Sequence, residues 1–368
     1  LNNIIISDNI ASGSGGGMKI SGCIDSMLEN ITISGNIAES VGGGLSISGD
    51  VTFIDVTISE NISVGKGGGM YIFSSDATFT NLTISENSAG DDGGGIYLTS
   101  MSSNPILTNL TISGNTAVDR GGGMYINWLD EGIFENFTIS ENSAGGDGGG
   151  IFLGACAITL NNSIIFNNTA DDDGGGMYIS GSNTNTTPIL TNLTISGNIA
   201  DDGGGGIFLY DTSPILTNII ISDNTANHHG GGVYIEGFSW GSNANFSKTL
   251  LSDNISYGHG GGIFMSANTQ LNLSNSTISN NKIIYQYAFG AGVYNDGGFA
   301  NIHNSILYFN RLEEDESLNY NINGYSQNNF AEYNVSFSDI EGEEDWVPNG
   351  DGNISQNPQF DTGYTLQA

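Results

Sequence analysis

A block of three consecutive glycines recurs throughout this chain and constrains its fold more than any other feature. Each triplet is followed by an aliphatic residue and usually by an aromatic one, as in the run Gly67–Tyr71. The aliphatic positions are separated by 25 to 30 residues, a period typical of solenoids in which each repeat packs on its neighbours. These positions are Met18, Leu45, Met70, Ile96, Met124, Ile151, Met177, Ile207, Val233, Ile263 and Val293.

A second block precedes each glycine triplet and alternates polar with apolar residues. In the copy Asn109–Asn115, Leu110 and Ile112 alternate with Asn, Thr and Ser. This alternation predicts a β-strand with one buried face. Stacked across the repeats, the inward positions form one aliphatic file, which predicts a continuous core: Ile6, Ile33, Ile58, Ile84, Ile112, Ile139, Ile165, Ile195, Ile221, Leu251, Ile278 and Leu307.

Three solenoid folds compete for this pattern. The copy Leu107–Asn115 also fits the leucine-rich repeat, in which the second half of each repeat usually carries a helix. Here that half contains three glycines, each costing about 1 kcal/mol in a helix relative to alanine, so we favour a parallel β-helix. A calcium-binding nonapeptide roll fits less well, because no nine-residue period is present.

The glycines and the last Asn of the alternating block predict how the coils stack. A sharp corner where backbones approach closely needs residues that accept positive φ and lack a Cβ, which explains the triplets. We expect each last Asn to lie at the other end of that corner. Its amide would bond the equivalent groups of neighbouring coils and satisfy polar groups that are costly to bury.

With these motifs the sequence resembles the right-handed parallel β-helix repeat proteins of bacterial and archaeal cell surfaces, in the pectin-lyase-like superfamily. The G-G-G-I/M repeats and Phe166–Asn168 are similar to the G-G-A-I and F-x-x-N motifs of the adhesin-type branch, which includes polymorphic outer-membrane proteins. The likeness covers about residues 1–311 and departs from that branch in its consistent G-G-G. It implies an all-β, right-handed parallel β-helix solenoid of about 11–12 coils with 25–30 residues per coil.

The repeats divide the chain into two segments. Residues 1–311 are expected to form the β-helix, and residues 312–368 an irregular acidic C-terminal segment. Within that segment, Leu312–Ser317 is predicted as a solvated acidic loop, and Tyr333–Phe337 is predicted to add one last coil before a cap. Because Leu1 already lies in mid-pattern, we expect the chain to be a piece of a longer protein.

The two cysteines are predicted to be free, buried thiols. Cys23 and Cys156 occupy the same column of the repeat but stand five coils apart. At about 4.8 Å per coil that separation is about 24 Å. This exceeds the reach of a disulfide.

Charge excludes one class of partner. The chain has 39 Asp and Glu residues against 6 Lys and Arg, for a net charge of -33. Affinity for nucleic acid comes from clustered Lys and Arg, so we expect no nucleic-acid partner. The chain also lacks a run of about 18 apolar residues, which argues against membrane insertion within this segment.

An aromatic column follows the aliphatic positions and is predicted to point outward. Equivalent residues in neighbouring coils lie about 4.8 Å apart, so the rings should stack into a stripe that could bind glycans or another protein. Cross-strand stabilisation of the sheet is the alternative explanation. The stripe comprises Tyr71, Tyr97, Tyr125, Phe152, Tyr178, Phe208, Tyr234, Phe264 and Tyr294.

Charged residues line the turn before each aliphatic position. The column Lys66, Asp92, Arg120, Asp147 and Asp173 alternates in sign over its first coils and predicts a surface ion-pair ladder. Five further carboxylates are predicted to crowd two neighbouring turns, where oxygen ligands suit calcium. A hydrated acidic edge is the alternative, and His228 and His229 beside them make a transition-metal site a third candidate. The five are Asp171, Asp172, Asp173, Asp201 and Asp202.

Outward polar files accompany the predicted strands. Repeated Thr and Ser residues form an array similar to the faces of β-helical ice-binding proteins, although Ile164, Ile220 and Leu250 interrupt the Thr file. The same repeats create candidate N-glycosylation sites. These are Asn81, Asn109, Asn136 and Asn192.

Catalysis fits the sequence poorly. A polyuronide lyase needs clustered cations, whereas the six Lys and Arg residues are scattered along the chain. A hydrolase needs paired carboxylates, and the only candidates are the Asp residues at one corner. We therefore expect a non-catalytic, extracellular or cell-surface rod with a structural or adhesive role, requiring no cofactor although calcium is a candidate ligand. It would bind glycans, surface proteins or its own copies. A polysaccharide-active lyase or hydrolase is the alternative, and an ice-binding protein the third candidate.

Overall fold

A computed structural model shows an all-β chain that forms two compact units, Leu1–Leu193 and Thr194–Ala368. No helix occurs among the described residues, and apart from β38 (Arg311–Leu312) with β39 (Asp315–Asn319) the strand pairs described here are parallel, which confirms the predicted parallel β-helix. The structure describes residues 1–23, 26–100, 103–181, 187–313, 315–319, 321–324, 332–341 and 351–354.

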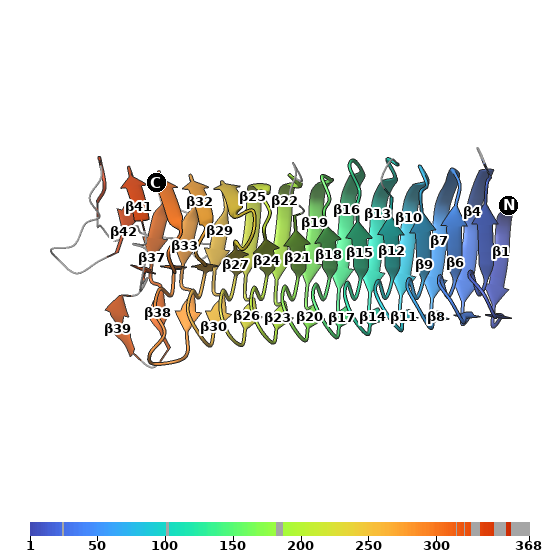
Figure 1. The fold of residues 1–368 in the computed structure, drawn as a ribbon, viewed down its shortest axis with the longest axis horizontal. Coiled ribbons are helices and arrows are strands. Elements are labelled where there is room, and N and C mark those ends of the chain that lie inside the picture. The colour runs from blue at the N-terminus through green and yellow to red at the C-terminus, as the bar shows by residue number, and fades with distance from the viewer. Residues whose placement is uncertain are drawn as a thin grey trace. The chain divides into compact units, whose positions relative to one another are not determined.

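In the first unit each coil contributes one strand to each of three sheets, and equivalent strands run side by side (Figure 1). Sheet A contains β1 (Asn2–Ser7), β4 (Ser26–Ser34), β7 (Val51–Ser59), β10 (Thr78–Ser85), β13 (Ile106–Ser113), β16 (Ile133–Ser140) and β19 (Thr159–Phe166). Sheet B contains β2 (Ile10–Ala11), β5 (Ile37–Ala38), β8 (Ile62–Ser63), β11 (Ser88–Ala89), β14 (Thr116–Ala117), β17 (Ser143–Ala144) and β20 (Thr169–Ala170). Sheet C contains β3 (Met18–Ser21), β6 (Leu45–Ser48), β9 (Met70–Phe73), β12 (Ile96–Thr99), β15 (Met124–Asn127), β18 (Ile151–Gly154) and β21 (Met177–Ser180).

The second unit repeats this arrangement, and strand β22 (Ile189–Ser196) contains the boundary between the units. Its sheet A strands are β25 (Ile215–Ser222), then the pairs β28 (Ser242–Ser247) with β29 (Leu250–Ser252), β32 (Thr269–Ser274) with β33 (Thr277–Ser279), β36 (Phe299–His303) with β37 (Ile306–Tyr308), and β41 (Glu332–Ser336) with β42 (Asp339–Ile340). Sheet B contains β23 (Ile199–Ala200), β26 (Thr225–Ala226), β30 (Ile255–Ser256), β34 (Lys282–Ile283), β38 (Arg311–Leu312) and β39 (Asp315–Asn319). Sheet C contains β24 (Ile207–Tyr210), β27 (Val233–Glu236), β31 (Ile263–Met265), β35 (Val293–Asn295) and β40 (Ile322–Gly324).

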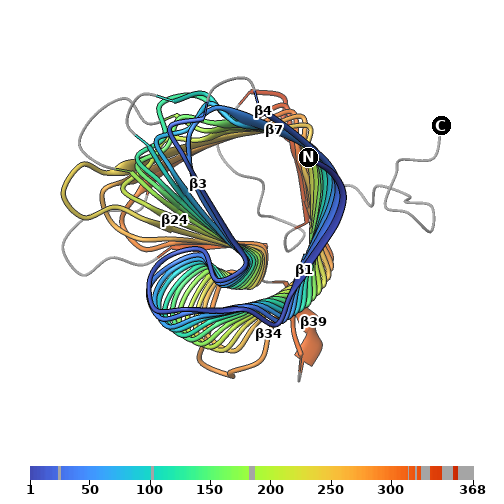
Figure 2. The ribbon, with the colours of Figure 1, turned by 90° about the vertical axis from the view of Figure 1, so that its right-hand side faces the viewer.

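The strand register places like residues over like. Between β10 and β13, for example, Leu82 pairs with Leu110 and Ile84 with Ile112, and all four are buried. Viewed end-on, the strands of a coil surround this core, and the chain folds inward just before the sheet C strands such as β3 (Figure 2). The predicted inward aliphatic file therefore forms the core of each unit.

The last Asn of each alternating block forms the predicted ladder. Asn115 is fully buried, and both its backbone N and its Nδ2 donate to Oδ1 of Asn142, at 3.0 and 2.9 Å. Its Nδ2 also donates to the Ile84 carbonyl at 3.0 Å. In the first unit the rungs are Asn9, Asn36, Asn61, Asn87, Asn115, Asn142 and Asn168, and in the second Asn198, Asn224, Asn254, Asn281, Asn310 and Asn321.

The glycine triplets lie where the chain folds inward, and glycine is required at their three positions for different reasons. Gly93 has φ of +71°, in the left-handed region that favours glycine. A Cβ on Gly94 would lie 2.3 Å from the Gly122 carbonyl oxygen, and one on Gly95 would lie 2.6 Å from that of Gly123. The first glycine of the triplet is thus required by its φ, and the other two by the next coil.

The coils continue beyond residue 311, where the sequence pattern breaks. Strand β40 pairs in parallel with β35, β41 with β36, and β42 with β37. The predicted last coil at Tyr333–Phe337 is thus largely strand β41. The solvated loop predicted over Leu312–Ser317 is wrong, because β38 and β39 pair there in antiparallel fashion. Most of the predicted cap falls outside the described residues.

Both cysteines are free, as predicted, but only one is buried. Cys156 is buried and Cys23 is half-buried. Burial raises the pKa of the Cys156 thiol to about 12, so this side chain stays protonated and unreactive at neutral pH.

The Asn ladder predicts a sharp contrast between two asparagines of one coil. Replacing Asn115 with alanine removes the acceptor for the backbone N and the Nδ2 of Asn87. Nδ2 of Asn87 keeps its bond to the Ile58 carbonyl, but the loss of two buried hydrogen bonds should still cost about 2–5 kcal/mol, measured as a shift in the urea unfolding midpoint. The matched control is Asn109→Gly, which removes an exposed amide and keeps the positive φ. A cost no larger than that of this control would contradict the role of the ladder.

Candidate functional site

The candidate site is the aromatic column on sheet C, at the second residue of each strand. In the first unit the ring centroids of Tyr71, Tyr97, Tyr125, Phe152 and Tyr178 follow one another at 5.2, 4.9, 4.8 and 5.0 Å. Neighbouring planes differ by only 4–5°. The register of β9, β12, β15, β18 and β21 sets this spacing, because parallel strands lie about 4.8 Å apart. The predicted stack is therefore present.

The predicted exposure of that stripe is wrong for its central members. Tyr97, Tyr125 and Phe152 are only 7%, 3% and 5% exposed, and Tyr71 and Tyr178 pack against them as half-buried flanks. A flat platform needs open ring faces, whereas these faces lie against one another. The stack therefore acts as a second hydrophobic core on the side of sheet C opposite the aliphatic one.

Two cations cover the stack. The Lys66 Nζ lies 4.7 Å from the Tyr97 ring centroid, and the Arg120 guanidinium carbon lies 5.2 Å from the Tyr125 centroid and 5.1 Å from that of Phe152. Such cation–π contacts contribute about 0.5–2 kcal/mol. Burial raises the pKa of Tyr125 to about 12, although Arg120 opposes that rise.

A buried carboxylate links the two cations. The Asp92 side chain has no exposed surface, and its two oxygens contact Lys66 Nζ at 2.9 Å and Arg120 Nε at 3.1 Å. The predicted ion-pair ladder thus exists at Lys66–Asp92–Arg120, but its central carboxylate is buried. In the next coil, burial first and then the charges of Asp172 and Asp119 raise the pKa of Asp147 to about 6.

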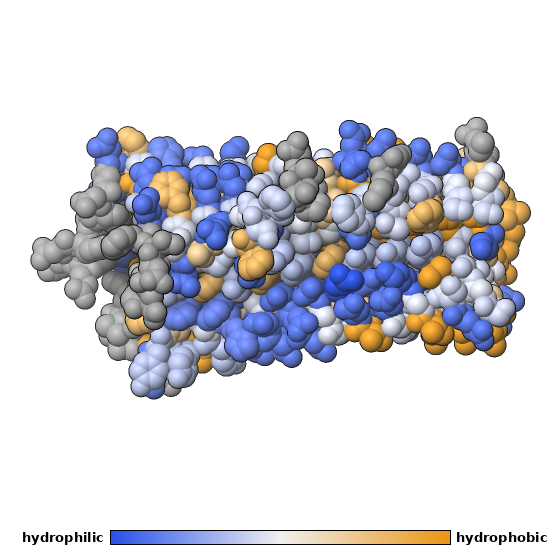
Figure 3. All heavy atoms as spheres, in the orientation of Figure 1, coloured by the Kyte–Doolittle hydropathy of each residue, from blue (hydrophilic) through white to orange (hydrophobic). Residues whose placement is uncertain are grey.

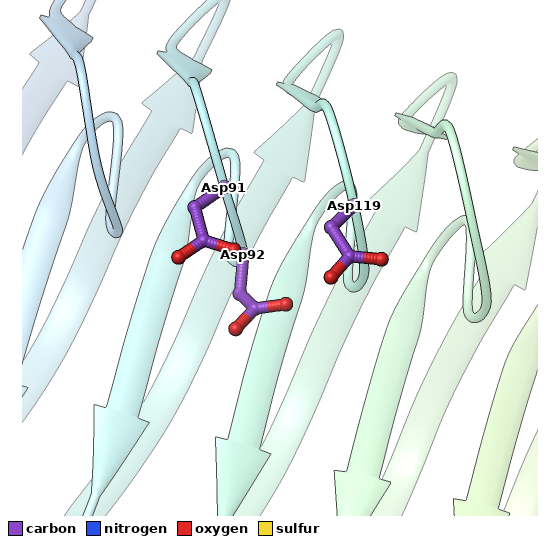
Figure 4. A group of neighbouring side chains, drawn as sticks. All are labelled: Asp91, Asp92 and Asp119. Carbon is purple, nitrogen blue, oxygen red and sulfur yellow. The ribbon is translucent and has the colours of Figure 1, made fainter.

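Three carboxylates gather at this point on two neighbouring coils (Figure 4). One oxygen from each of Asp91, Asp92 and Asp119 lies within 4.8 Å of the others, which is metal-ligand spacing. However, Lys66 Nζ also lies 3.8 Å from Asp91, and Arg120 Nε lies 3.5 Å from Asp119. Two cations already compensate these three charges, so a metal ion would have to displace them. The sequence pattern did not single out this trio, although Asp92 shares a column with Lys66 and Arg120 and the other two lie in the adjacent column.

The five Asp residues predicted to bind calcium divide between the two units. In the first unit Asp171 and Asp172 are exposed, and the half-buried Asp173 donates its backbone N to Asp147 Oδ1 at 3.4 Å. In the second unit Asn227 Nδ2 donates to Asp201 at 3.0 Å, and His228 Nδ1 lies 2.6 Å from Asp202. Calcium binding by these residues stays a prediction.

Histidines replace the cations over the aromatic column of the second unit. His229 stacks on Phe264 at 4.7 Å, and His259 on Tyr294 at 4.3 Å. Burial, followed by repulsion from His259 and His228, lowers the pKa of His229 to about 4. The His229 Nδ1 accepts a bond from the His259 backbone N at 2.9 Å, which favours a neutral ring and leaves Nε2 as the protonated nitrogen. That proton disfavours metal binding by His229.

The aromatic rings beneath these histidines are tilted and mostly buried. Phe208 and Tyr234 lie 4.6 Å apart at 47°, and Tyr234 and Phe264 lie 4.6 Å apart at 64°. Phe208, Phe264 and Tyr294 are 2%, 5% and 6% exposed, so the exposed stripe is wrong here also, and only Tyr234 is half-buried.

The candidate glycosylation asparagines are exposed, but their amides are bonded. Nδ2 of Asn109 donates to Asn81 at 3.0 Å, and Nδ2 of Asn136 donates to Asn109 at 3.0 Å. Asn192 Nδ2 donates to Asn162 at 2.9 Å, and that of Asn81 to Asp55 at 2.9 Å. An N-linked glycan would occupy this same nitrogen and weaken one rung of an outer ladder. Glycosylation and ice binding stay predictions.

Comparison with known proteins identifies the repeat. A family model described as a right-handed beta helix region matches residues 36–192 and 112–247, which together span more than half of the chain. No curated protein and no solved structure matches this sequence. Among the described residues, no helix has the length and apolar character needed to cross a membrane.

The buried ion pair predicts different roles for two adjacent aspartates. Asp92→Asn leaves Lys66 and Arg120 without their shared carboxylate and should destabilise the fold by about 1–3 kcal/mol, a value reduced because both cations are about one-third exposed. Asp91→Asn, whose carboxylate is 44% exposed, should change stability by less than about 0.5 kcal/mol. Urea unfolding midpoints give both values, and equal effects would exclude a central role for Asp92.

The lowered pKa of His229 predicts a loss of stability in acid. The unfolded chain takes up this proton near pH 6.5 and the folded chain near pH 4, so the contribution is fully present above 6.5 and is lost as pH falls toward 4. NMR titration of the 4 histidines should find one ring with a midpoint near 4. His229→Phe should make the unfolding midpoint less sensitive to acid. A His229 midpoint at or above 6.5 would refute this.

Proposed function

Since the chain belongs to the right-handed β-helix family, matched over residues 36–247, we propose that it is a non-catalytic structural and adhesive scaffold outside the cell or on its surface. Fold alone does not decide this, because one fold carries many functions. The observation that carries the proposal is that the residues of each repeat column satisfy one another's hydrogen bonds and charges. Their polar and charged groups bond the equivalent groups of neighbouring coils, as in Lys66–Asp92–Arg120 and the Asn ladder.

The pairing of the cations supports a non-catalytic role. A lyase acting on acidic polysaccharides would need cations that are available to bind substrate. Beyond Lys66 and Arg120, Lys282 Nζ lies 2.7 Å from Glu313, and Arg311 contacts Glu341 through two nitrogens at 2.5 and 2.6 Å. Four of the 6 Lys and Arg residues therefore already have carboxylate partners.

The surface of the first unit supports an adhesive role. Hydrophobic residues gather on the face shown in Figure 3 over the first strands of Figure 1. Large hydrophobic side chains are also exposed beyond the first coil, where Ile62, Val64 and Val118 are 46%, 64% and 67% exposed. Contiguous exposed apolar surface favours contact with another protein or another copy of the chain. Glycans are the third kind of partner, and no cofactor is required for any of these contacts.

One observation favours a second candidate, a polysaccharide hydrolase. The pKa of Asp147, raised to about 6, is suited to a general acid, and Asp172 and Asp119 are close enough to contribute to that rise. Against it, the same burial that raises this pKa restricts access to the carboxyl group.

Assays on the whole chain separate the two candidates. Incubation with polygalacturonate and with neutral polysaccharides should release no reducing ends and no unsaturated uronates above a heat-denatured control. Insoluble polysaccharide or a surface-protein preparation should retain the chain. Product release would overturn the scaffold proposal, and its loss in Asp147→Asn but not in Asp91→Asn would establish the hydrolase instead.

A further inference from the structure

The loop between β27 and β28 presents two exposed aromatic side chains. Phe238 is 74% exposed and Trp240 is 64% exposed. Exposed apolar side chains that lie together on one loop can mark a binding site. This loop, Gly237–Gly241, lies within the second unit and interrupts the repeat pattern.

A buried carboxylate holds this loop in place. Asp211, only 8% exposed, follows strand β24 in the preceding coil. Its Oδ1 accepts backbone N–H bonds from Phe238 at 2.7 Å, Gly241 at 3.2 Å and Trp240 at 3.3 Å. Its Oδ2 accepts one from Ser239 at 3.0 Å. Although burial opposes it, these bonds lower the pKa of Asp211, so the carboxylate stays charged and the loop is fixed before any ligand arrives.

A hollow of about 340 Å³ lies beside Trp240, within the size range of small-ligand sites. Its lining combines aromatic, amide and hydroxyl side chains, and none of its lining side chains in the described part of the chain is charged. The amides are oriented by their neighbours, because Asn272 Nδ2 donates to Asn243 Oδ1 at 2.9 Å and Gln270 Nε2 donates to Asn272 Oδ1 at 3.2 Å. The lining includes Ser213, Trp240, Asn243, Asn268, Gln270 and Phe299.

We propose that this hollow and Trp240 form a binding site for a neutral sugar ring of a glycan. A hexose has an apolar face of C–H groups, which packs on an aromatic ring, and hydroxyl groups at its edge, which pair with amides. Asn243, Asn268 and Gln270 can both donate to and accept from such hydroxyls. The inference rests on the proposed adhesive function and names one ligand class for it.

Charge restricts the ligand to uncharged sugars. No Lys or Arg lines the hollow in the described part of the chain, and Asp211 keeps its own negative charge beneath the loop. A uronate or sulfated sugar would bring an anion to a chain with net charge -33. Neutral oligosaccharides should therefore bind more tightly than acidic ones of the same length.

The test uses the whole chain and a panel of hexasaccharides: maltohexaose, cellohexaose, mannohexaose, galactohexaose and hexagalacturonate. Isothermal titration calorimetry gives Kd, and tryptophan fluorescence reports contact with Trp240. At least one neutral probe should bind with a fluorescence change. Trp240→Ala should weaken that binding at least tenfold, and Trp240→Phe should weaken it less because a ring remains.

Matched controls separate this site from any other. Trp128→Ala removes another exposed tryptophan, 45% exposed in the first unit, and should leave Kd unchanged. Phe238→Ala removes an exposed ring of the same loop that does not line the hollow and should change Kd less than Trp240→Ala. Circular dichroism confirms that each variant is folded.

Three results would overturn the inference: no neutral probe binds, Trp240→Ala binds as well as the wild type, or hexagalacturonate binds more tightly than the neutral probes. None of these results bears on the scaffold proposal. That proposal depends on the absence of product release and on retention of the chain by insoluble polysaccharide or a surface-protein preparation. Conversely, product release from a bound neutral probe would overturn the scaffold proposal while leaving this site in place.

Discussion

The structure depends on parallel, in-register stacking of one coil on the next at about 4.8 Å. At this spacing, the residues at each position of the repeat stack into a column. Equivalent residues of successive coils therefore contact one another along each unit. Aliphatic positions become the core, the last Asn becomes a buried hydrogen-bond ladder, and Tyr or Phe becomes a ring stack. A charged residue that would repel its own copy at that distance has to be compensated by a residue in a neighbouring coil.

Charge shows how this compensation works. Like charges repel along a column, but alternation lets Asp92 bond Lys66 and Arg120 at once. In the second unit the same column carries His229 and His259, which avoid the repulsion by remaining neutral and accepting backbone N–H bonds. Both solutions cover the aromatic stack, and both leave side chains occupied rather than available for chemistry. These contacts are the physical support for the proposed scaffold role.

Specific recognition is then expected where the repeat is broken. The segment Gly237–Gly241 has no counterpart in the preceding coil, and it carries the exposed Trp240. It is held by Asp211, a side chain from that coil. The repeat thus provides a rigid base, and the irregular loop provides a local surface that differs from the repeated columns.

The sequence by itself determined the parallel β-helix, the aliphatic file, the glycine corner and the Asn ladder, because each follows from one period and from local backbone preferences. The sequence did not predict the burial or the pairing of a side chain where these depend on what lies opposite that residue in the fold. Alternation placed the aromatic column outside the sheet, but only the inward fold of the glycine corner brought Lys66 and Arg120 over Tyr97 and Tyr125. Likewise, the residues next to Asp211 in the sequence do not predict that its carboxylate accepts hydrogen bonds from a loop 27 to 30 residues later. Tertiary structure decided burial and pairing, because these are properties of contacts between coils and not of any one repeat.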